Sequence, residues 1–347
     1  MKRIHLLLLP ILLSLGAALA SAQKDGKAAP ASQAAAATIR IWGDPAMQPM
    51  LESWEQGFGE RDPEVRFENR LLGSVTAIAG VDHQVAQIAA LGRPLGVDES
   101  MSFEWIYRYK PLTLKVSSGS VNRRGELPAL AIFVNRANPI ARLSLDQLRT
   151  IFSCCGGAKG EAGYTVLWGD FSDAASWAHR PVHPMGPSFD KGEVAFFRAN
   201  VLHGSRQWNC AYRSFLDSRA MIRAVADDRG AIAIGTMADA DSAVKVVPLA
   251  GPDGVAIVPD RDSVADHIYP LARYTYLVVN RGPDRPLDAP TLRFLRYVLS
   301  KQGQAAIGHG SGFLPLPESV AVRQRAILDP QGKPDDSHAK LTSGEEQ

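Results

Sequence analysis

Short strand-like runs and longer helix-like runs of apolar residues alternate along this chain. Residues 38–42 (TIRIW) alternate in polarity as a half-buried strand does, and apolar residues then recur at helical spacing from Met50 to Phe58. Residues 65–69 (VRFEN) form a second strand-like run, and the turn at Gly73 leads into another helical pattern. This alternation is typical of a mostly parallel sheet with helices on both faces.

The same alternation continues through the second half of the chain. Strands are predicted over 129–135, 182–185 and 274–280, of which the first and the last are the most strongly apolar. One helix is predicted to start at the capping-box sequence 144–147 (SLDQ), and another spans 191–202. The fold class therefore stays the same along the chain.

The order of the strands and the length of the chain indicate two lobes. The strongest strands, 130–135 and 274–280, bracket a middle unit, so we expect the chain to leave a first lobe, build a second and return. A chain of 347 residues is also longer than one hydrophobic core usually serves. We predict an α/β protein of two Rossmann-like lobes joined by two hinge strands, with lobe 1 at 38–130 and 275–329 and lobe 2 at 131–274.

The N-terminal residues have the pattern of a cleaved secretory signal. Lys2 and Arg3 precede an apolar run over 4–19, and Ala20-Ser21-Ala22 has the small-x-small form of a cleavage site. We therefore predict that residues 1–22 are removed and that the mature protein is exported to the periplasm.

Two polar segments flank the predicted lobes. Residues 23–37 (QKDGKAAPASQAAAA) and 330–347 contain too few large apolar side chains to bury a core. We expect a disordered linker and a disordered tail there. No later window is apolar for long enough to suggest a membrane span.

Charge and cysteine content narrow the class of partner. The formal net charge is +2 and the basic residues are scattered, which argues against nucleic-acid binding. The cysteines are Cys154, Cys155 and Cys210, and in an oxidising compartment we expect one disulfide between Cys210 and either Cys154 or Cys155. No further ligands at metal-site spacing accompany them, so no metal is expected.

The turn Gly73-Ser74-Val75-Thr76 is the main candidate for binding chemistry. Its hydroxyls and the first N–H groups of the following helix converge on one place, with the positive end of the helix dipole behind them. Such a turn suits a small anion. The alternative is an ordinary N-cap, in which Ser74 or Thr76 bonds to its own helix.

An ordered series of motifs between about Ile39 and Pro317 carries a family likeness. Its members are Trp54 and Phe58, Gly73-Ser74, Gly92-Arg93-Pro94-Leu95, Val134-Asn135, Asn138-Pro139, Leu143–Leu148, Ile151-Phe152, Trp168, Gly230-Ala231-Ile232 and Tyr269–Arg273. In these residues the chain resembles the periplasmic phosphate-binding proteins of ABC transporters, which are type II solute-binding proteins with two hinged lobes.

The resemblance implies a protein that is not an enzyme and that needs no cofactor. It would capture a small oxyanion, phosphate by default, in the cleft between the lobes and close on it by hinge motion. The implied partner is an ABC permease in the inner membrane, and the implied oligomeric state is a monomer.

The ligand loops of the family are altered in this chain. The first loop, usually Gly-Ser-x-Thr, reads Gly43-Asp44-Pro45-Ala46, in which Pro45 lacks an N–H and Asp44 repels an anion if it points inward. The loop of the second lobe, usually Gly-Arg-Asp-x-x-Ser-Gly-Thr, reads GPSFDKGE over 186–193. The ligand-binding residues that the resemblance leaves are Ser74, Thr76, Arg93, Ser188, Lys191 and Ala46.

Each of these residues also has a purely structural alternative. Arg93 could pair with an acid at the lobe surface, and Lys191 could be solvated. Ser188 or Asp190 could cap a helix, and Asp44 could stabilise its own turn.

The altered loops leave two other functions open. One is a divergent paralogue with a degenerate phosphate site, which binds another solute or acts in periplasmic sensing or interaction. The other is a hydrolase that recruits Asp44, Asp82 or His83. The sequence disfavours the hydrolase because it has no nucleophile elbow, no metal-ligand set and no carboxylate pair placed by a motif.

Overall fold

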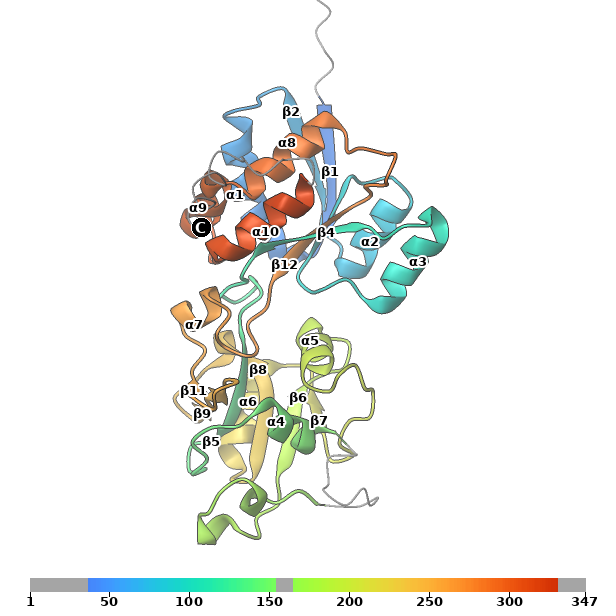
Figure 1. Ribbon diagram of the computed structural model, residues 1–347. Coiled ribbons are helices and arrows are strands. Elements are labelled where there is room, and N and C mark those ends of the chain that lie inside the picture. Colours follow the sequence, from blue (N-terminus) through green and yellow to red (C-terminus); the bar gives the residue numbers. More distant parts are fainter. Residues whose placement is uncertain (1–36, 154–164, 330–347) are drawn as a thin grey trace, which may run out of the picture. The chain divides into compact units, whose positions relative to one another are not determined.

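Two five-stranded sheets organise the residues that the computed structural model describes, 37–153 and 165–329 (Figure 1). The described residues all fall within one unit of the chain. Each sheet mixes parallel and antiparallel strands and buries apolar side chains on both of its faces.

The first sheet, of strand order β2-β1-β3-β12-β4, is built around three parallel strands. β1 pairs in parallel with β2 on one side and with β3 on the other, so the carboxyl ends of all three lie at one edge. β12 runs antiparallel between β3 and β4. The strands are β1 (Ala37–Gly43), β2 (Val65–Arg70), β3 (Ile88–Leu91), β4 (Leu112–Ser117) and β12 (Thr275–Val279).

Apolar helix faces cover both sides of this sheet. Figure 1 shows α2 and α3 on one face and α1, α8, α9 and α10 on the other. The buried faces carry Trp54, Phe294 and Ile307 on one side, and Ile78 and Phe103 on the other. The helices are α1 (Gln48–Gly59), α2 (Ser74–Asp82), α3 (Val97–Tyr107), α8 (Ala289–Val298), α9 (Lys301–Gly310) and α10 (Glu318–Leu328).

The second sheet has the strand order β7-β6-β8-β5-β9. β6 runs parallel to β7 and β8, and β5 runs antiparallel to β8 and β9. Its strands are β5 (Leu130–Asn135), β6 (His183–Pro187), β7 (Arg213–Phe215), β8 (Ala231–Thr236) and β9 (Val244–Val246).

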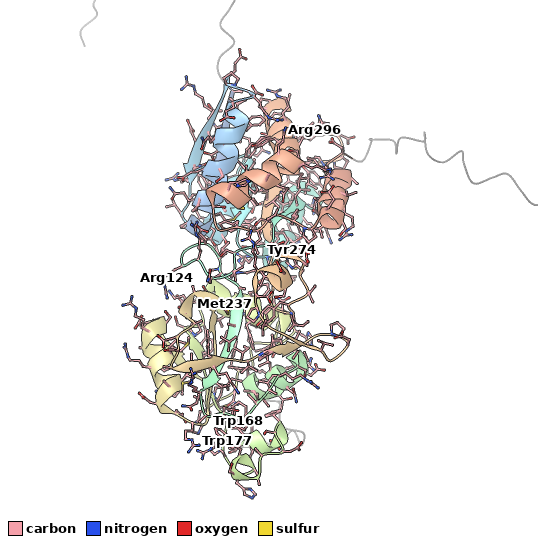
Figure 2. All side chains as sticks on the ribbon, turned by 90° about the vertical axis from the view of Figure 1, so that its left-hand side faces the viewer. Arg124, Trp168, Trp177, Met237, Tyr274 and Arg296 are labelled. Atoms are coloured by element: carbon pink, nitrogen blue, oxygen red, sulfur yellow. The ribbon has the colours of Figure 1, made fainter. Side chains whose placement is uncertain are left out.

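Helices also cover the second sheet on both faces. Side chains of α4, α5 and α7 enter one core, which includes the paired rings of Trp168 and Trp177, whose centroids are 6.4 Å apart (Figure 2). Side chains of α6 enter the other core. The remaining elements are α4 (Leu145–Phe152), α5 (Gly192–Asn200), α6 (Ser218–Asp227), α7 (Arg261–Ala265), β10 (Leu249–Ala250), β11 (Ala256–Ile257) and the 3-10 helices η1 (Pro45–Met47), η2 (Trp168–Asp170), η3 (Ala175–Trp177) and η4 (Met237–Asp239).

The predicted α/β fold is confirmed, with boundary corrections of one residue. Ala37, which the sequence placed in the linker, is the first residue of β1, because the partner strand already begins opposite it at Val65. Leu130, which the sequence placed in lobe 1, pairs with Thr236 in the second sheet. The predicted signal and tail lie outside the described residues.

The two links between the sheets are the segments that precede the predicted hinge strands. Residues 118–129 follow β4 and precede β5, and residues 266–274 follow α7 and precede β12. Within the described ranges, no helix combines the length and the apolar character needed to cross a bilayer.

The predicted disulfide involves cysteines that the structure describes only in part. Cys210 is exposed, whereas Cys154 and Cys155 lie outside the described residues. Ser153 forms an isolated bridge with Trp208, and the N–H of Asn209 donates to the carbonyl of Phe152 at 2.9 Å. The chain therefore runs directly beside the Cys210 segment just before it reaches Cys154, which supports the prediction without testing it.

We predict that protein isolated from an oxidising compartment without reductant shows one titratable thiol after denaturation, and three after reduction, because two of its three cysteines are bonded. Thiol titration with an aromatic disulfide reagent measures both numbers. The variant Cys210→Ser serves as the control and should show two thiols before reduction. Three thiols in the unreduced parent protein would exclude the bond.

The indole of Trp54 provides a test of the first core. Trp54 is fully buried, and its Nε1 donates to the carbonyl of Gly303 at 2.8 Å. Trp54→Phe removes this donor, so we expect the free energy of unfolding to fall by about 1–3 kcal/mol. The control Trp105→Phe changes an indole that is 73% exposed, and it should shift the free energy of unfolding by less than about 0.5 kcal/mol. Urea unfolding measures the free energy of unfolding of both variants. Equal effects would contradict the claim that the buried Trp54 indole and its hydrogen bond stabilise the first core.

Candidate functional site

Three turns meet at the carboxyl edge of the first sheet, one after each parallel strand. The N–H of Asp44, after β1, donates to the carbonyl of Ala90 in β3 at 2.9 Å. The N–H of Gly73, after β2, donates to the carbonyl of Gly43 at 2.9 Å. These bonds fix the turns at Asp44, Gly73 and Gly92 against one another, as expected for a ligand-binding edge.

The carboxylate of Asp44 lies among these turns and accepts from two of them. Its Oδ1 accepts from the N–H of Ala46 at 3.0 Å, and its Oδ2 accepts from the hydroxyl of Ser74 at 3.2 Å. Both donors were predicted to bind an anionic ligand. In this structure they bind the carboxylate of Asp44, which is the N-cap residue of η1, so the alternative that Asp44 stabilises its own turn is confirmed.

The helix α2 begins at the Gly73 turn without a side-chain cap. Gly73 is the N-cap residue with φ 114°, a backbone conformation that favours glycine, and neither Ser74 nor Thr76 bonds to the helix start. The alternative that one of them caps its own helix is therefore wrong. Among the described residues, the N–H groups of Ser74, Val75 and Thr76 have no acceptor, so they remain available to an anion.

Arg93 forms a two-pronged ion pair with an acid of the same lobe. Its Nη1 and Nη2 donate to the two carboxylate oxygens of Glu99 at 2.8 and 2.6 Å, and Glu99 also accepts from the N–H of Gly96 at 2.7 Å. Burial alone would raise the pKa of Glu99, but the bonds from Arg93 and Gly96 hold it below its ordinary value of 4.5. The planar fork of Arg93 is thus already engaged.

In the second lobe, the loop after β6 carries Ser188 and Lys191. The N–H of Ser188 donates to Phe215 at 3.1 Å, and the N–H of Lys191 donates to the carbonyl of Ser188 at 3.0 Å, which makes a tight turn. Lys191 is the N-cap residue of α5 and is exposed, and no side chain caps this helix. Neither Ser188 nor Asp190 therefore takes the N-cap position.

A cavity of about 350 Å³ is lined both by the turn after β1 and by the loop after β6. From the predicted site it includes Ala46 of the first lobe and Lys191 of the second, whereas Ser74, Thr76, Arg93 and Ser188 are not among its lining residues. Further lining comes from the 118–129 link, the carboxyl ends of β6, β7 and β8, and the helices α5, α6 and η4. These residues are Arg124, Gly125, Leu127, Pro128, Pro187, Glu193, Phe215, Leu216, Asp217, Ser218, Met221, Gly235, Thr236, Ala238 and Asp239.

Two of the five charged side chains of the cavity wall, those of Arg124 and Asp239, are paired with one another. Arg124 forms an ion pair with Asp239 at 3.1 Å and donates to the carbonyl of Ala238 at 2.8 Å, beside Met237 (Figure 2). Asp217 caps α6 by accepting from the N–H of Ala220 at 2.9 Å. Within the described ranges, Lys191 and Glu193 have no ion-pair partner.

Behind this wall lies Arg273, which the sequence placed in the family likeness but not in the site. It is 3% exposed, and its Nη2 donates to the carbonyl of Pro128 at 2.6 Å. Burial lowers the pKa of Arg273, and the charges of Glu193 and Asp44 act in the opposite direction. This buried guanidinium thus interacts electrostatically with Asp44 of the first lobe and with Glu193 of the second.

The sequence contained weak signals for some of the missed residues. Thr236 and Asp239 have capping-box spacing, and the hydroxyl of Thr236 donates to Asp239 at 2.7 Å. Asp217 directly precedes the helix that it caps. Arg124 stands in a polar stretch between two strong strands, where nothing local indicates its partner.

No group of three or more metal-ligating side chains is found in the part of the chain that the structure describes. The candidate site is a cavity of mixed charge that includes Lys191, with the free N–H groups of α2 at the nearby carboxyl edge of the first sheet but outside the cavity lining.

Comparison with known proteins identifies the family. A model of the PBP superfamily domain matches residues 28–302. The phosphate-binding protein PstS of Pseudomonas aeruginosa is 30% identical over 286 residues, which cover 81% of this chain and 84% of that protein. The chain therefore belongs to the PBP superfamily, and the resemblance to phosphate-binding proteins is confirmed.

Solved structures support the same fold. The ABC-type phosphate transport receptor of Vibrio cholerae matches with a TM-score of 0.56 and 20% identity, over 80% of this chain and 100% of that chain. PstS of Borrelia burgdorferi matches with a TM-score of 0.57 and 14% identity, over 81% of this chain and 99% of that chain.

The ion pair of Arg93 makes stability depend on pH. Because the pKa of Glu99 is lowered in the folded state, the pair stabilises the fold above the unfolded value of 4.5 and loses this effect as the pH falls through the folded value. We predict that Arg93→Met lowers the free energy of unfolding more at pH 7 than at pH 3.

Chemical denaturation of parent and variant at both pH values measures this difference. Lys110→Met is the control, because Lys110 is exposed and lies 4.0 Å from its partner Glu104. A stability gap for Arg93→Met that is the same at pH 7 and pH 3 would contradict the pairing.

Proposed function

We propose that this chain is the solute-binding component of an ABC import system, exported to the periplasm, and that it captures a small oxyanion in the cavity. Phosphate is the first candidate. The observation that carries the proposal is that the cavity draws on Ala46 at the carboxyl edge of the first sheet and on Lys191 in the second lobe. That is where a two-lobed α/β protein binds its ligand.

The choice of phosphate rests on relatives and on the remaining donors. The relatives above are named as phosphate-binding proteins and as a phosphate transport receptor. The unpaired ammonium of Lys191 supplies positive charge in the cavity, and the start of α2, which does not line the cavity, offers free N–H groups at the carboxyl edge of the first sheet.

The same proposal includes a protein that is not an enzyme, works as a monomer and delivers its ligand to an ABC permease. The names of the relatives, which describe binding and transport, support the first and last of these points.

A second candidate is a divergent member of the family that binds another solute or serves in sensing. The observation in its favour is that carboxylates engage the predicted anion donors: Asp44 accepts from Ala46 and Ser74, and Glu99 accepts from Arg93. Acidic side chains at the cavity wall also oppose an oxyanion with two negative charges.

We predict that phosphate binds the mature protein with one site per chain, and that Lys191→Gln weakens this binding about tenfold, because one charge-assisted hydrogen bond is lost. Isothermal titration calorimetry with phosphate, and with sulfate for comparison, measures the affinity. Lys301→Gln is the control, since Lys301 is exposed at the start of α9 and distant in sequence from both ligand loops.

A folded protein that releases no heat and gains no thermal stability at millimolar phosphate would contradict the choice of phosphate. The second candidate would then be tested with a wider panel of solutes. Equal affinities of Lys191→Gln and the parent would remove Lys191 from the site.

A further inference from the structure

The carboxylate of Asp44 caps the 3-10 helix η1 and also reaches the turn at Ser74. One oxygen accepts from a backbone N–H, that of Ala46, at 3.0 Å, and the other accepts from the hydroxyl of Ser74 at 3.2 Å. A backbone N–H and a hydroxyl from two turns are the donors that a small oxyanion needs.

Two arginines add their charge to this environment. The positive charges of Arg93 and Arg273 both interact with Asp44. Arg273 is 3% exposed, and its Nε has no hydrogen-bond partner among the described residues. A buried guanidinium with an unused donor stabilises negative charge nearby, because little water screens it.

An external anion and Asp44 compete for these donors because each donates one hydrogen, which Asp44 already accepts. Gly92 lies close to the carboxylate: a Cβ there would come 3.2 Å from the Oδ2 of Asp44 and 2.7 Å from the side chain of Leu127. Leu127 also lines the cavity. The half-buried carboxylate thus lies beside Gly92, and Gly92 lies beside a residue of the cavity wall.

We propose that Asp44 is a tethered anion that occupies the oxyanion subsite of the first lobe and competes with free oxyanions for the donors of Ala46 and Ser74. This inference rests on the proposed function and names the residue that sets its ligand specificity. A tethered group acts at an effective concentration of about millimolar or higher, so free oxyanion must exceed that level to displace it. Asp44 thereby selects against multiply charged oxyanions, which it also repels.

The test replaces the carboxylate and measures oxyanion affinity. Asp44→Ser removes the charge and frees the hydroxyl of Ser74, while its own hydroxyl can still cap η1 at Ala46. Asp44→Asn removes the charge but keeps the shape and an oxygen that can accept from Ala46. We expect Asp44→Ser to bind phosphate and sulfate at least tenfold more tightly than the parent in calorimetry at fixed pH and ionic strength. Asp44→Asn should lie between the two.

Two controls distinguish occupation of the donors by Asp44 from the general repulsion of an anion by a nearby carboxylate. Asp217→Asn removes another carboxylate of the cavity wall and retains the cap of α6, so it should change the affinity far less than Asp44→Ser. In the Asp44→Ser background, Ser74→Ala should remove most of the gain. A thermal melt of each variant establishes that it is folded.

The outcomes distinguish this inference from the proposed function. Tight phosphate binding by the parent with no gain in Asp44→Ser overturns the tethered anion and leaves the function standing. Absent binding by the parent with clear binding by Asp44→Ser supports the tethered anion and rejects phosphate as the ligand of the parent. A folded Asp44→Ser that binds neither anion, or an equal gain in Asp217→Asn, overturns the tethered anion.

Discussion

The parallel pairing of β1 with both β2 and β3 is the constraint on which the candidate site depends. Parallel neighbours end at the same edge of a sheet, so turns that are distant in sequence meet there. Close approach is possible because Gly43 has no side chain: a Cβ there would come 2.9 Å from the Cβ of Ala90. The contact of Asp44 with Ser74 depends on this meeting of strand ends, whereas its contact with Ala46 is local to the turn.

Fold and ligand chemistry are determined by different residues in this protein. The cores of the two sheets keep the architecture of the PBP superfamily, and the link residue Pro128 keeps contact with the buried Arg273. At the strand ends, acids of the chain engage donors that could serve a ligand. These side chains are separate from the cores, so a fold of this kind can be kept while the chemistry of its site varies.

The sequence was sufficient to predict those helices and strands in which burial imposes a regular spacing of apolar residues. β5 and α4 were predicted because β5 is buried throughout and α4 buries one face, with Leu148, Ile151 and Phe152. α3 was missed because its outer face is as apolar as its inner one: Val97 and Trp105 are 76% and 73% exposed, which removes the amphipathic signal.

The site was predictable only in part, for a related reason. The positions of the turns follow from the strand pattern, but the direction of a side chain does not. Ser74 and its acceptor Asp44 are 30 residues apart and are joined only by the register of the sheet. The same holds for Arg124 and Asp239, which meet through the fold of the second sheet.

A crystal structure of the mature parent protein at saturating phosphate tests this account most directly. We expect that Asp44 still accepts from Ala46 and Ser74, and that phosphate lies in the cavity on the side of Lys191. Phosphate bound to Ala46 and Ser74, with the carboxylate of Asp44 turned away from both, would contradict it.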